Sequence, residues 1–432
     1  MKLYMKKVAF HTLGCKVNHY ETNAMIQQFL EDGYEIVDFD KKADIYVINT
    51  CTVTNMSDKK SRQNLRKVKK KNPAAIIVAV GCYAQIAKNE LEKIDEIDIV
   101  LGNNEKKDII KYINEYNNNK VIKVSEIEKC KEYLELGTVV HLETTRAVIK
   151  IQDGCNNFCT YCIIPYARGR IRSRNKDMIL NEVQKIVDLG IKEVVLTGIH
   201  IDSYGKEKED NYYLIDLIED INKIGKLERI RIGSLEPTII TEEFCKRLSK
   251  VEKICNHFHL SLQSGCNTTL KRMNRKYTIE EFKKCVESLR KTFKEINLTT
   301  DIIVGFPGEN EKEFEETYKF LEEIKFFKMH IFKYSKRKGT VAEKMENQID
   351  ENIKEERSKM LIELSNRNEE EILKKYINKT IDVLFEEKKD EYWIGHTKNY
   401  MTVKVKTEEY LKNLLVSVKI VKYENGYLIA KY

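Results

Sequence analysis

The chain has 432 residues, of which 42% are hydrophobic and 33% are charged, and its formal net charge is +8. This length exceeds one ordinary core and predicts two or three domains; no apolar run reaches the roughly 20 residues that cross a membrane. The first residues lack the apolar stretch of a secretion signal, so a cytoplasmic location is expected, and disulfides among the 11 cysteines are not.

Up to about residue 116, short β-branched runs alternate with amphipathic stretches, which is typical of an open parallel α/β sheet. Residues 116–120 and the Lys- and Glu-rich stretch near Lys129 have little apolar periodicity and are interpreted as a linker. A boundary near residues 135–140 is expected, with a first domain over residues 1–137. The predicted strands are Val8–Phe10, Ile45–Ile48, Ile76–Val80 and Ile97–Leu101.

Three cysteines of this domain, Cys15, Cys51 and Cys82, each follow a predicted strand. Because the carboxyl ends of parallel strands lie along one edge of a sheet, three thiolates can meet there. Chance placement in a cysteine-rich chain is the alternative.

The next segment, residues 138–370, predicts six strands separated by amphipathic helices such as Met178–Leu189, Ile279–Phe293 and Glu313–Ile324. Six βα units indicate an incomplete, (β/α)6 version of the TIM-like barrel. The predicted strands are Ala147–Ile151, Glu193–Leu196, Ile230–Ile232, Phe258–Leu262, Thr300–Val304 and His330–Tyr334.

A cysteine motif follows the first of these strands. Cys155, Cys159 and Cys162 have the spacing C-x-x-x-C-x-x-C, and the next cysteine is Cys245. One tight loop can therefore bring three thiolates to an iron-sulfur cubane and leave its fourth iron open. A structural zinc site needs a fourth ligand close by. An open iron at the top of an α/β barrel is what radical S-adenosylmethionine (SAM) chemistry requires.

The last segment, residues 371–432, follows a predicted charged helix over Glu351–Tyr376. From Lys374 to Tyr432 there are 12 lysines and 8 acidic residues, so this stretch carries +4, half of the net charge. Five short alternating strands indicate a small all-β barrel of the kind that binds oligonucleotides. These strands are Thr380–Phe385, Tyr392–His396, Met401–Val405, Val416–Tyr423 and Tyr427–Ala430.

Two segments resemble the radical SAM methylthiotransferases: Gly154–Arg174, GCNNFCTYCIIPYARGRIRSR, and His11–Met25, HTLGCKVNHYETNAM. The resemblance implies that the barrel cysteines hold the 4Fe-4S cluster that works with SAM. It also implies that the three strand-end cysteines hold a second 4Fe-4S cluster, so that Cys51 takes part in catalysis through that cluster. An electron donor of the flavodoxin or ferredoxin type is expected, and the source of the inserted sulfur is left open.

Other barrel segments resemble the parts of this family that contact SAM. They lie around Leu196–Gly198, Leu260–Gly265 and Asp301–Glu309. Glycines that merely end strands, and a buried hydrogen-bonding network at Gln263 and Ser264, are the alternatives. The candidate cofactor-binding residues are Tyr161, Thr197, Gly198, Gln263, Ser264, Ile303 and Gly305.

Candidate RNA contacts follow the cluster loop and lie in the last segment. Arg168, Arg170, Arg172 and Arg174 alternate, so they share one side of an extended chain and suit RNA phosphates. Pairing with acidic groups of the protein or with the cofactor carboxylate is the equal alternative. The segment Trp393–Met401 resembles the RNA-binding TRAM domain, which implies contacts by Lys398 and Tyr400, while Trp393 is interpreted as a core residue.

Taken with this resemblance, the sequence favours methylthiolation of carbon 2 of N6-threonylcarbamoyladenosine beside the anticodon of a tRNA. The alternatives are N6-isopentenyladenosine in tRNA, an aspartate in a ribosomal protein, and a non-catalytic metal-bound RNA-binding protein.

Overall fold

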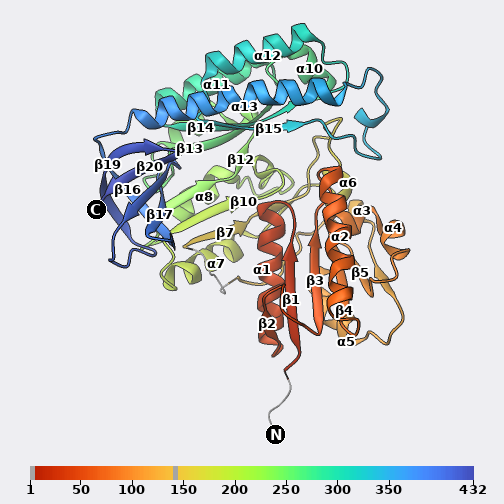
Figure 1. Ribbon diagram of the computed structural model, residues 1–432. Helices are drawn as coiled ribbons and strands as arrows, with labels where there is room; N and C mark the ends of the chain where they lie inside the picture. Colours follow the sequence, from red (N-terminus) through yellow and green to blue (C-terminus); the bar gives the residue numbers. More distant parts are fainter. Residues whose placement is uncertain (1–4, 140–144) are drawn as a thin grey trace.

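Three groups of elements follow one another along the chain in the computed structural model, which describes residues 5–139 and 145–432 (Figure 1). A parallel sheet with its helices comes first, a larger α/β layer follows, and a small β barrel lies at the C-terminal end. Among the described residues, no helix combines the length and apolarity needed to span a membrane. Residue 140, the upper end of the expected domain boundary, lies outside the described residues.

The first group is a parallel sheet with the strand order β2-β1-β3-β4-β5-β6. All four predicted strands are present, and β5 begins two residues later than expected. β2 and β6 were not predicted, because each has only three residues; β6 lies between the two stretches interpreted as a linker. The strands are β1 (Lys7–Thr12), β2 (Glu35–Val37), β3 (Ile45–Thr50), β4 (Ile76–Gly81), β5 (Ile99–Leu101) and β6 (Val121–Lys123).

Helices cover both faces of this sheet, which is why the central strands β3 and β4 are buried on both faces rather than on one. On β3, Ile48 belongs to the same core as Leu65 of α2, whereas its neighbour Val47 belongs to the opposite core with Met25 of α1. The helices are α1 (Lys16–Glu31), α2 (Asn55–Lys71), α3 (Cys82–Ile86), α4 (Lys88–Glu92) and α5 (Ile109–Asn114).

The second group contains the six predicted barrel strands, all parallel. Gly233 interrupts the third of them, which is therefore recorded as β11 and β12. Among the described residues no ladder joins the last strand to the first, so the barrel stays open between β15 and β7. The strands are β7 (Arg146–Lys150), β10 (Glu193–Thr197), β11 (Arg229–Ile232), β12 (Ser234–Leu235), β13 (His257–Gln263), β14 (Asn297–Val304) and β15 (Lys328–Lys333).

The barrel helices pack their apolar faces onto the outer side of these strands and form the largest core of the molecule. The three predicted helices are present with ends shifted by at most two residues, and Gly190 follows α7 with φ +90°. The longer helices are α7 (Lys176–Asp188), α8 (Leu214–Asn222), α9 (Glu242–Leu248), α10 (Asn267–Arg272), α11 (Ile279–Thr292) and α12 (Glu311–Ile324).

Two further short strands and one short helix surround the cluster loop. β8 (Gln152–Asp153) and β9 (Arg172–Ser173) pair antiparallel, and α6 (Ile164–Arg168) lies between them. This arrangement brings both ends of the cysteine loop back to the end of β7.

The charged helix α13 (Glu351–Lys374) lies against β15 and leads to a closed five-stranded barrel with the order β16-β17-β18-β20-β19 (Figure 1). Trp393 is buried in its core, as expected. Its strands are β16 (Thr380–Lys389), β17 (Tyr392–Thr397), β18 (Thr402–Lys406), β19 (Leu415–Glu424) and β20 (Tyr427–Lys431).

The small barrel contacts the amino ends of the large barrel's strands. Arg229, the first residue of β11, donates from Nη1 to the His396 carbonyl at 2.9 Å. Asn297, the first residue of β14, donates from Nδ2 to the Asn399 carbonyl at 2.9 Å. The small barrel therefore covers one end of the strands, while the cysteine loop lies at the other.

Candidate active site

The three barrel cysteines lie together in the loop between β8 and α6. Burial raises the pKa of the Cys155 thiol to about 11 and that of Cys162 to about 12, and Cys159 is close enough to raise both further. The backbone N–H of Asn157 donates to Cys155 Sγ at 3.4 Å. The loop thus gathers three half-buried sulfur atoms at the carboxyl end of the barrel.

The other three predicted cysteines also meet. Cys15 caps α1 after β1, Cys51 directly follows β3, and Cys82 begins α3 after β4. Because β1, β3 and β4 are neighbours in the sheet, their carboxyl ends lie side by side. Burial raises the pKa of Cys51 to about 11, and both Cys82 and Cys15 lie near enough to raise it further.

Glycine precedes a cysteine at three of these positions, where a side chain would not fit. Gly14, Gly81 and Gly154 have φ values of +102°, +101° and +73°. A Cβ on Gly14 would lie 2.8 Å from Cys51 Sγ, and one on Gly154 would lie 1.9 Å from the Arg170 carbonyl. Glycine therefore allows the backbone to approach the sulfur atoms closely.

The residues present fit iron-sulfur clusters better than single zinc ions. Among the described residues, neither cysteine triad belongs to a group of side chains placed closely enough to hold a single metal ion, and a structural zinc site takes four ligands. The raised pKa values of Cys51, Cys155 and Cys162 mean that these metal-free thiols are neutral near pH 7, so bound iron would have to displace their protons.

One buried arginine connects the two triads. Arg168, the last residue of α6, is fully buried, and its Nε donates to Cys82 Sγ at 3.2 Å. Its Nη atoms donate to Glu21 of α1 and to Asp153, which precedes the cluster loop. Asn103 adds a second connection, because its Nδ2 donates to the Ala167 carbonyl at 2.7 Å and lies 3.9 Å from Cys82 Sγ.

The charges around Arg168 are balanced inside the protein. Burial alone would raise the pKa of Asp153, but Lys150 and Arg168 lower it to about 2. Burial would also raise the pKa of Glu21, which Arg168, Lys106 and Lys150 instead hold well below its usual range. Both carboxylates are therefore ionised, and the arginine stays charged beside the sulfur of Cys82.

The expectation that Arg168, Arg172 and Arg174 bind RNA phosphates is wrong, because all three are buried and have partners in the protein. Arg172 donates from Nη2 to the Arg168 carbonyl at 2.7 Å, and Arg174 donates from Nε to Glu135 at 2.8 Å and pairs with Glu182. Arg170 alone of the four is exposed, and its guanidinium lies 4.6 Å from the centre of the Phe158 ring.

Lys398 and Tyr400 also have contacts other than the expected ones. Lys398 Nζ donates to the Glu252 carbonyl at 2.6 Å. The Tyr400 ring stacks on His396 and lies near His257, each at 4.8 Å between ring centres. These side chains hold the small barrel against the large one, and an RNA contact by either remains a prediction.

The predicted cofactor residues lie at the carboxyl ends of the barrel strands, on the side of the cluster loop. Thr197 ends β10, and a Cβ on the following Gly198 would lie 2.7 Å from Ile201 Cγ2. Ile303 lies on β14, and Gly305 follows that strand with φ +69°. These positions agree with a ligand beside the cluster, without showing one.

Three further cofactor candidates differ in their surroundings. Tyr161 lies in the cluster loop and packs edge-on against Phe306, with ring centres 6.3 Å apart. Gln263 ends β13 with φ +71° and is half-buried. Ser264 is fully buried and its hydroxyl bonds with that of Thr317 at 3.3 Å, so it belongs to a buried hydrogen-bonding network.

Sequence reasoning missed a charged group beside the cluster loop. Arg275 Nη1 donates to Cys159 Sγ at 3.2 Å, and its Nη2 donates to Glu236 at 2.9 Å. Burial would raise the pKa of Glu236, but His200 and Arg275 lower it to about 2. Arg275 and Glu236 are separated by 39 residues from each other and by more from the cysteines, so no local motif marked them.

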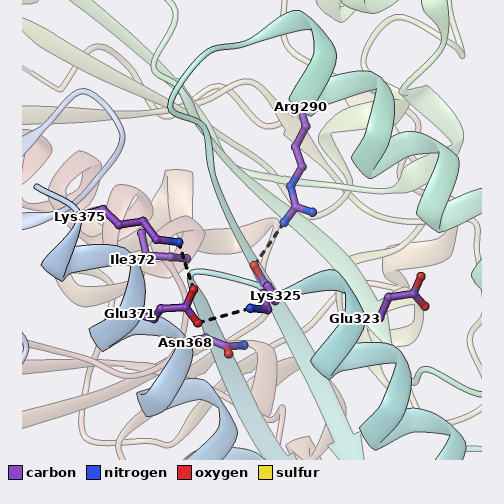
Figure 2. Close-up of a pocket in the computed structure, with 7 residues that line it drawn as sticks. All are labelled: Arg290, Glu323, Lys325, Asn368, Glu371, Ile372 and Lys375. Atoms are coloured by element: carbon purple, nitrogen blue, oxygen red, sulfur yellow. Dashed lines mark hydrogen bonds and ion pairs between the residues drawn. The ribbon is translucent and has the colours of Figure 1, made fainter.

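A surface cavity of about 230 Å³ near the ends of α11, α12 and α13 is not part of this site (Figure 2). Its charged groups pair with each other: Glu371 accepts from Lys325 at 3.4 Å and from Lys375 at 3.1 Å. Arg290 donates to the Ile324 carbonyl at 2.6 Å. These contacts join the helices and leave little for a ligand to satisfy.

Comparisons with known proteins agree with this geometry. Residues 149–321 match the radical SAM superfamily, and residues 7–102 match the uncharacterized protein family UPF0004. The solved radical SAM methyltransferase TsrM from Kitasatospora setae is similar in fold, with a TM-score of 0.58 at 13% identity over 76% of this chain and 73% of that one.

Two curated relatives match nearly the whole chain. The threonylcarbamoyladenosine tRNA methylthiotransferase MtaB of Bacillus subtilis (strain 168) is 47% identical over 97% of this chain and 94% of its own length. The tRNA-2-methylthio-N(6)-dimethylallyladenosine synthase of Alkaliphilus oremlandii (strain OhILAs) is 37% identical over 96% of this chain and 90% of its own. The chain therefore belongs to the radical SAM methylthiotransferase family that includes the threonylcarbamoyladenosine tRNA methylthiotransferases.

Proposed function

We propose that this enzyme adds a methylthio group to carbon 2 of N6-threonylcarbamoyladenosine next to the anticodon of a tRNA. Cys155, Cys159 and Cys162 would hold the 4Fe-4S cluster that binds SAM, and Cys15, Cys51 and Cys82 would hold a second. Residues 1–137 would form the domain of the second cluster, residues 138–370 the radical SAM domain, and residues 371–432 a TRAM domain.

The observation that carries this proposal is the contact between the two cysteine sites. Arg168 lies on the helix that begins two residues after Cys162, and its Nε reaches Cys82 Sγ at 3.2 Å. A fixed, buried link between two open clusters is what a reaction needs when a radical formed at one must be followed by sulfur transfer from the other, because positioning lowers the barrier.

The bound clusters and SAM would supply the substrate radical and the sulfur, and the chain's own residues would orient them. Arg275 would keep a positive charge at Cys159 Sγ, since Glu236 holds its guanidinium at 2.9 Å. Arg168 would do the same at Cys82. Hydrogen bonds and positive charges at the sulfur ligands are known means of setting a cluster's potential.

The remaining partners follow from the same proposal. The excess of lysine in residues 371–432 suits a polyanion, and Arg170 is the exposed arginine beside the cluster loop. We infer a tRNA substrate, an electron donor of the flavodoxin or ferredoxin type, and a cytoplasmic location.

Mass spectrometry of tRNA nucleosides from a strain lacking the gene tests the substrate. The 2-methylthio derivative of N6-threonylcarbamoyladenosine should be absent, its unthiolated precursor should accumulate, and the wild-type gene should restore the product. Loss of the dimethylallyladenosine derivative instead would assign the other substrate of the family, for which the Alkaliphilus relative is named. Unchanged tRNA would contradict the proposal.

A further inference from the structure

A cavity of about 420 Å³ lies inside the large barrel, below the cysteine loop. The residues that line it come from α1 and α13, from β11, β13, β14 and β15, and from the segment that joins β17 to β18. They include Lys16, Arg231, His257, Asp301, His330 and Tyr400. None of the six predicted cluster ligands is among them.

Arg231 is the distinctive residue of this cavity. It is 3% exposed, and its Nε donates to Glu193 Oε1 at 2.8 Å. Neither of its terminal nitrogens has a hydrogen-bond partner among the described residues. The central carbon of its guanidinium lies 4.5 Å from the centre of the Tyr400 ring, and this contact keeps the guanidinium group in place. A buried hydrogen-bond donor without a partner costs free energy of folding. The two terminal nitrogens of Arg231 therefore require an acceptor that the described residues do not supply.

The other charges of the cavity favour an anion. No ion pair or hydrogen bond engages Lys16 Nζ within the described residues, and His257 Nδ1 is buried without a partner. Of the two acids of the wall, Glu369 pairs with Lys328 Nζ at 3.2 Å, and Asp301 lies 3.3 Å from His259 Nε2, with which it forms an ion pair when that histidine is protonated.

The cavity is also placed where a base substituent can reach. His257 lies six residues before Gln263 on β13, and Asp301 lies two residues before Ile303 on β14. At about 3.3 Å per residue, these distances are roughly 20 Å and 7 Å along the strands from the cofactor positions. The cavity is therefore a continuation of the same lumen toward the small barrel.

We propose that this cavity binds the carboxylate of the N6-threonylcarbamoyl group, with Arg231 as the bidentate donor and Lys16 as a second cation. The proposal rests on the function proposed above. A planar guanidinium with two free N–H groups matches a carboxylate in geometry. An apolar dimethylallyl group would leave the two buried terminal nitrogens of Arg231 unpaired, so the cavity would select the anionic substituent over the apolar one.

A divalent ion is the competing occupant, because one ligand atom from each of His259, Asp301 and His330 lies within 4.8 Å of the others. Two features of the cavity speak against it. Lys16 and Arg231 line the same space and repel a cation, and Arg231's free N–H groups can only donate.

The test uses the reconstituted holoenzyme and three anticodon stem-loop RNAs, bearing N6-threonylcarbamoyladenosine, its methyl ester, or N6-dimethylallyladenosine. The wild type should bind the RNA with N6-threonylcarbamoyladenosine (the acid RNA) on the order of 10- to 100-fold more tightly than the RNA with its methyl ester (the ester RNA). This is the difference expected for a charged hydrogen-bonded pair between Arg231 and the carboxylate. Arg231→Lys and Lys16→Ala should each lose most of this preference, because they bind the acid RNA more weakly while their affinity for the ester RNA stays the same. Because the RNA backbone is the same in all three probes, a phosphate contact would not produce the difference.

Lys111→Ala is the matched control, since it removes an exposed lysine of α5 outside this cavity, and it should keep the wild-type preference. Lys16 is itself exposed, so Lys16→Ala keeps the test meaningful if Arg231→Lys fails to fold.

The outcomes separate the inference from the proposed function. If both pocket variants prefer the acid as strongly as the wild type does, the inference is wrong. A preference that disappears on chelation of a bound metal, and that Arg231→Lys does not alter, would also overturn it. If the wild type methylthiolates the RNA with the free acid, and both variants keep the wild-type binding preference for that RNA over the ester, only the inference fails. If the wild type modifies none of the three RNAs, the proposed function fails as well.

Discussion

Arg168, Glu21, Asp153 and Lys150 form a group of charges from three segments of the chain, and each is at least 95% buried. Removing such charges from water costs several kcal/mol per ion, which only close pairing offsets. The group joins α1, the end of β7 and the cluster loop. Its contribution is therefore to the relative position of the two cysteine sites as well as to stability.

Replacing Arg168 tests this role. Arg168→Gln should lower the free energy of unfolding by about 3–5 kcal/mol, because it leaves a buried acid with fewer partners. Urea unfolding of the metal-free protein measures the loss. Arg170→Gln, at the exposed position two residues later, should change it by less than about 0.5 kcal/mol. Equal stabilities of the two variants would contradict the role given to Arg168.

Asp202 gives the stability a distinct pH dependence. Burial raises the pKa of this carboxyl to about 7, although His200 and the Glu236 backbone N–H lower it in part. Because the folded-state pKa lies above the unfolded value of about 3.9, its contribution is full below pH 4 and is lost as the pH rises toward 7.

Asp202→Asn should remove the loss of stability that the carboxyl group of Asp202 causes as the pH rises. Relative to the wild type, the variant should gain about 2–4 kcal/mol in free energy of unfolding between pH 4 and pH 8, as a shift of this size implies. Urea unfolding of the metal-free proteins at several pH values measures the difference. A difference between variant and wild type that stays constant with pH would show that Asp202 is not protonated in the folded state.

At the scale of single elements, the glycine before Cys155 controls the start of the cluster loop. Gly154→Ala would add strain of about 1–2 kcal/mol at a positive φ and place a Cβ 1.9 Å from the Arg170 carbonyl. The variant should be less stable and should bind less iron on reconstitution. Gly190→Ala has a positive φ but open space around the new Cβ, so it should lose stability and keep its iron. Full iron binding by Gly154→Ala would show that the loop tolerates the shift.

Periodicity was sufficient to predict most of the elements. β3 begins with four apolar residues, β4 is apolar throughout, and α11 has a clear polar and apolar face, so local sequence determines them. β2 and β6, with three residues each, depend on pairing with β1 and β5. Such pairing is a tertiary effect and leaves little trace in local sequence.

The same distinction applies to the site. The cysteines could be found because their spacing and their positions after strands are local features. The partners of Arg168 could not, because Glu21 and Cys82 are 147 and 86 residues away. An alternating arginine pattern describes which side of the chain the residues share, and it does not reveal whether that side faces solvent or a buried acid.

At the scale of the whole molecule, the two α/β layers bring the carboxyl ends of their strands toward one another, and the small barrel contacts the opposite end of the larger layer (Figure 1). The enclosed lumen between these ends contains Arg231 and Lys16. This arrangement supports a reaction in which the base enters between two clusters while its substituent lies deeper in the barrel.

We assign SAM cleavage to one cluster and sulfur transfer to the other. Comparison of the wild type, Cys51→Ala and Cys155→Ala after anaerobic reconstitution tests these two roles most directly. Iron, SAM cleavage and methylthiolated tRNA are measured for each. The wild type should hold about eight iron atoms per chain and each variant fewer, about four if one cluster is lost. Cys155→Ala should lose both SAM cleavage and product, whereas Cys51→Ala should keep cleavage and make no methylthiolated tRNA. Unimpaired methylthiolation by Cys51→Ala would contradict the account.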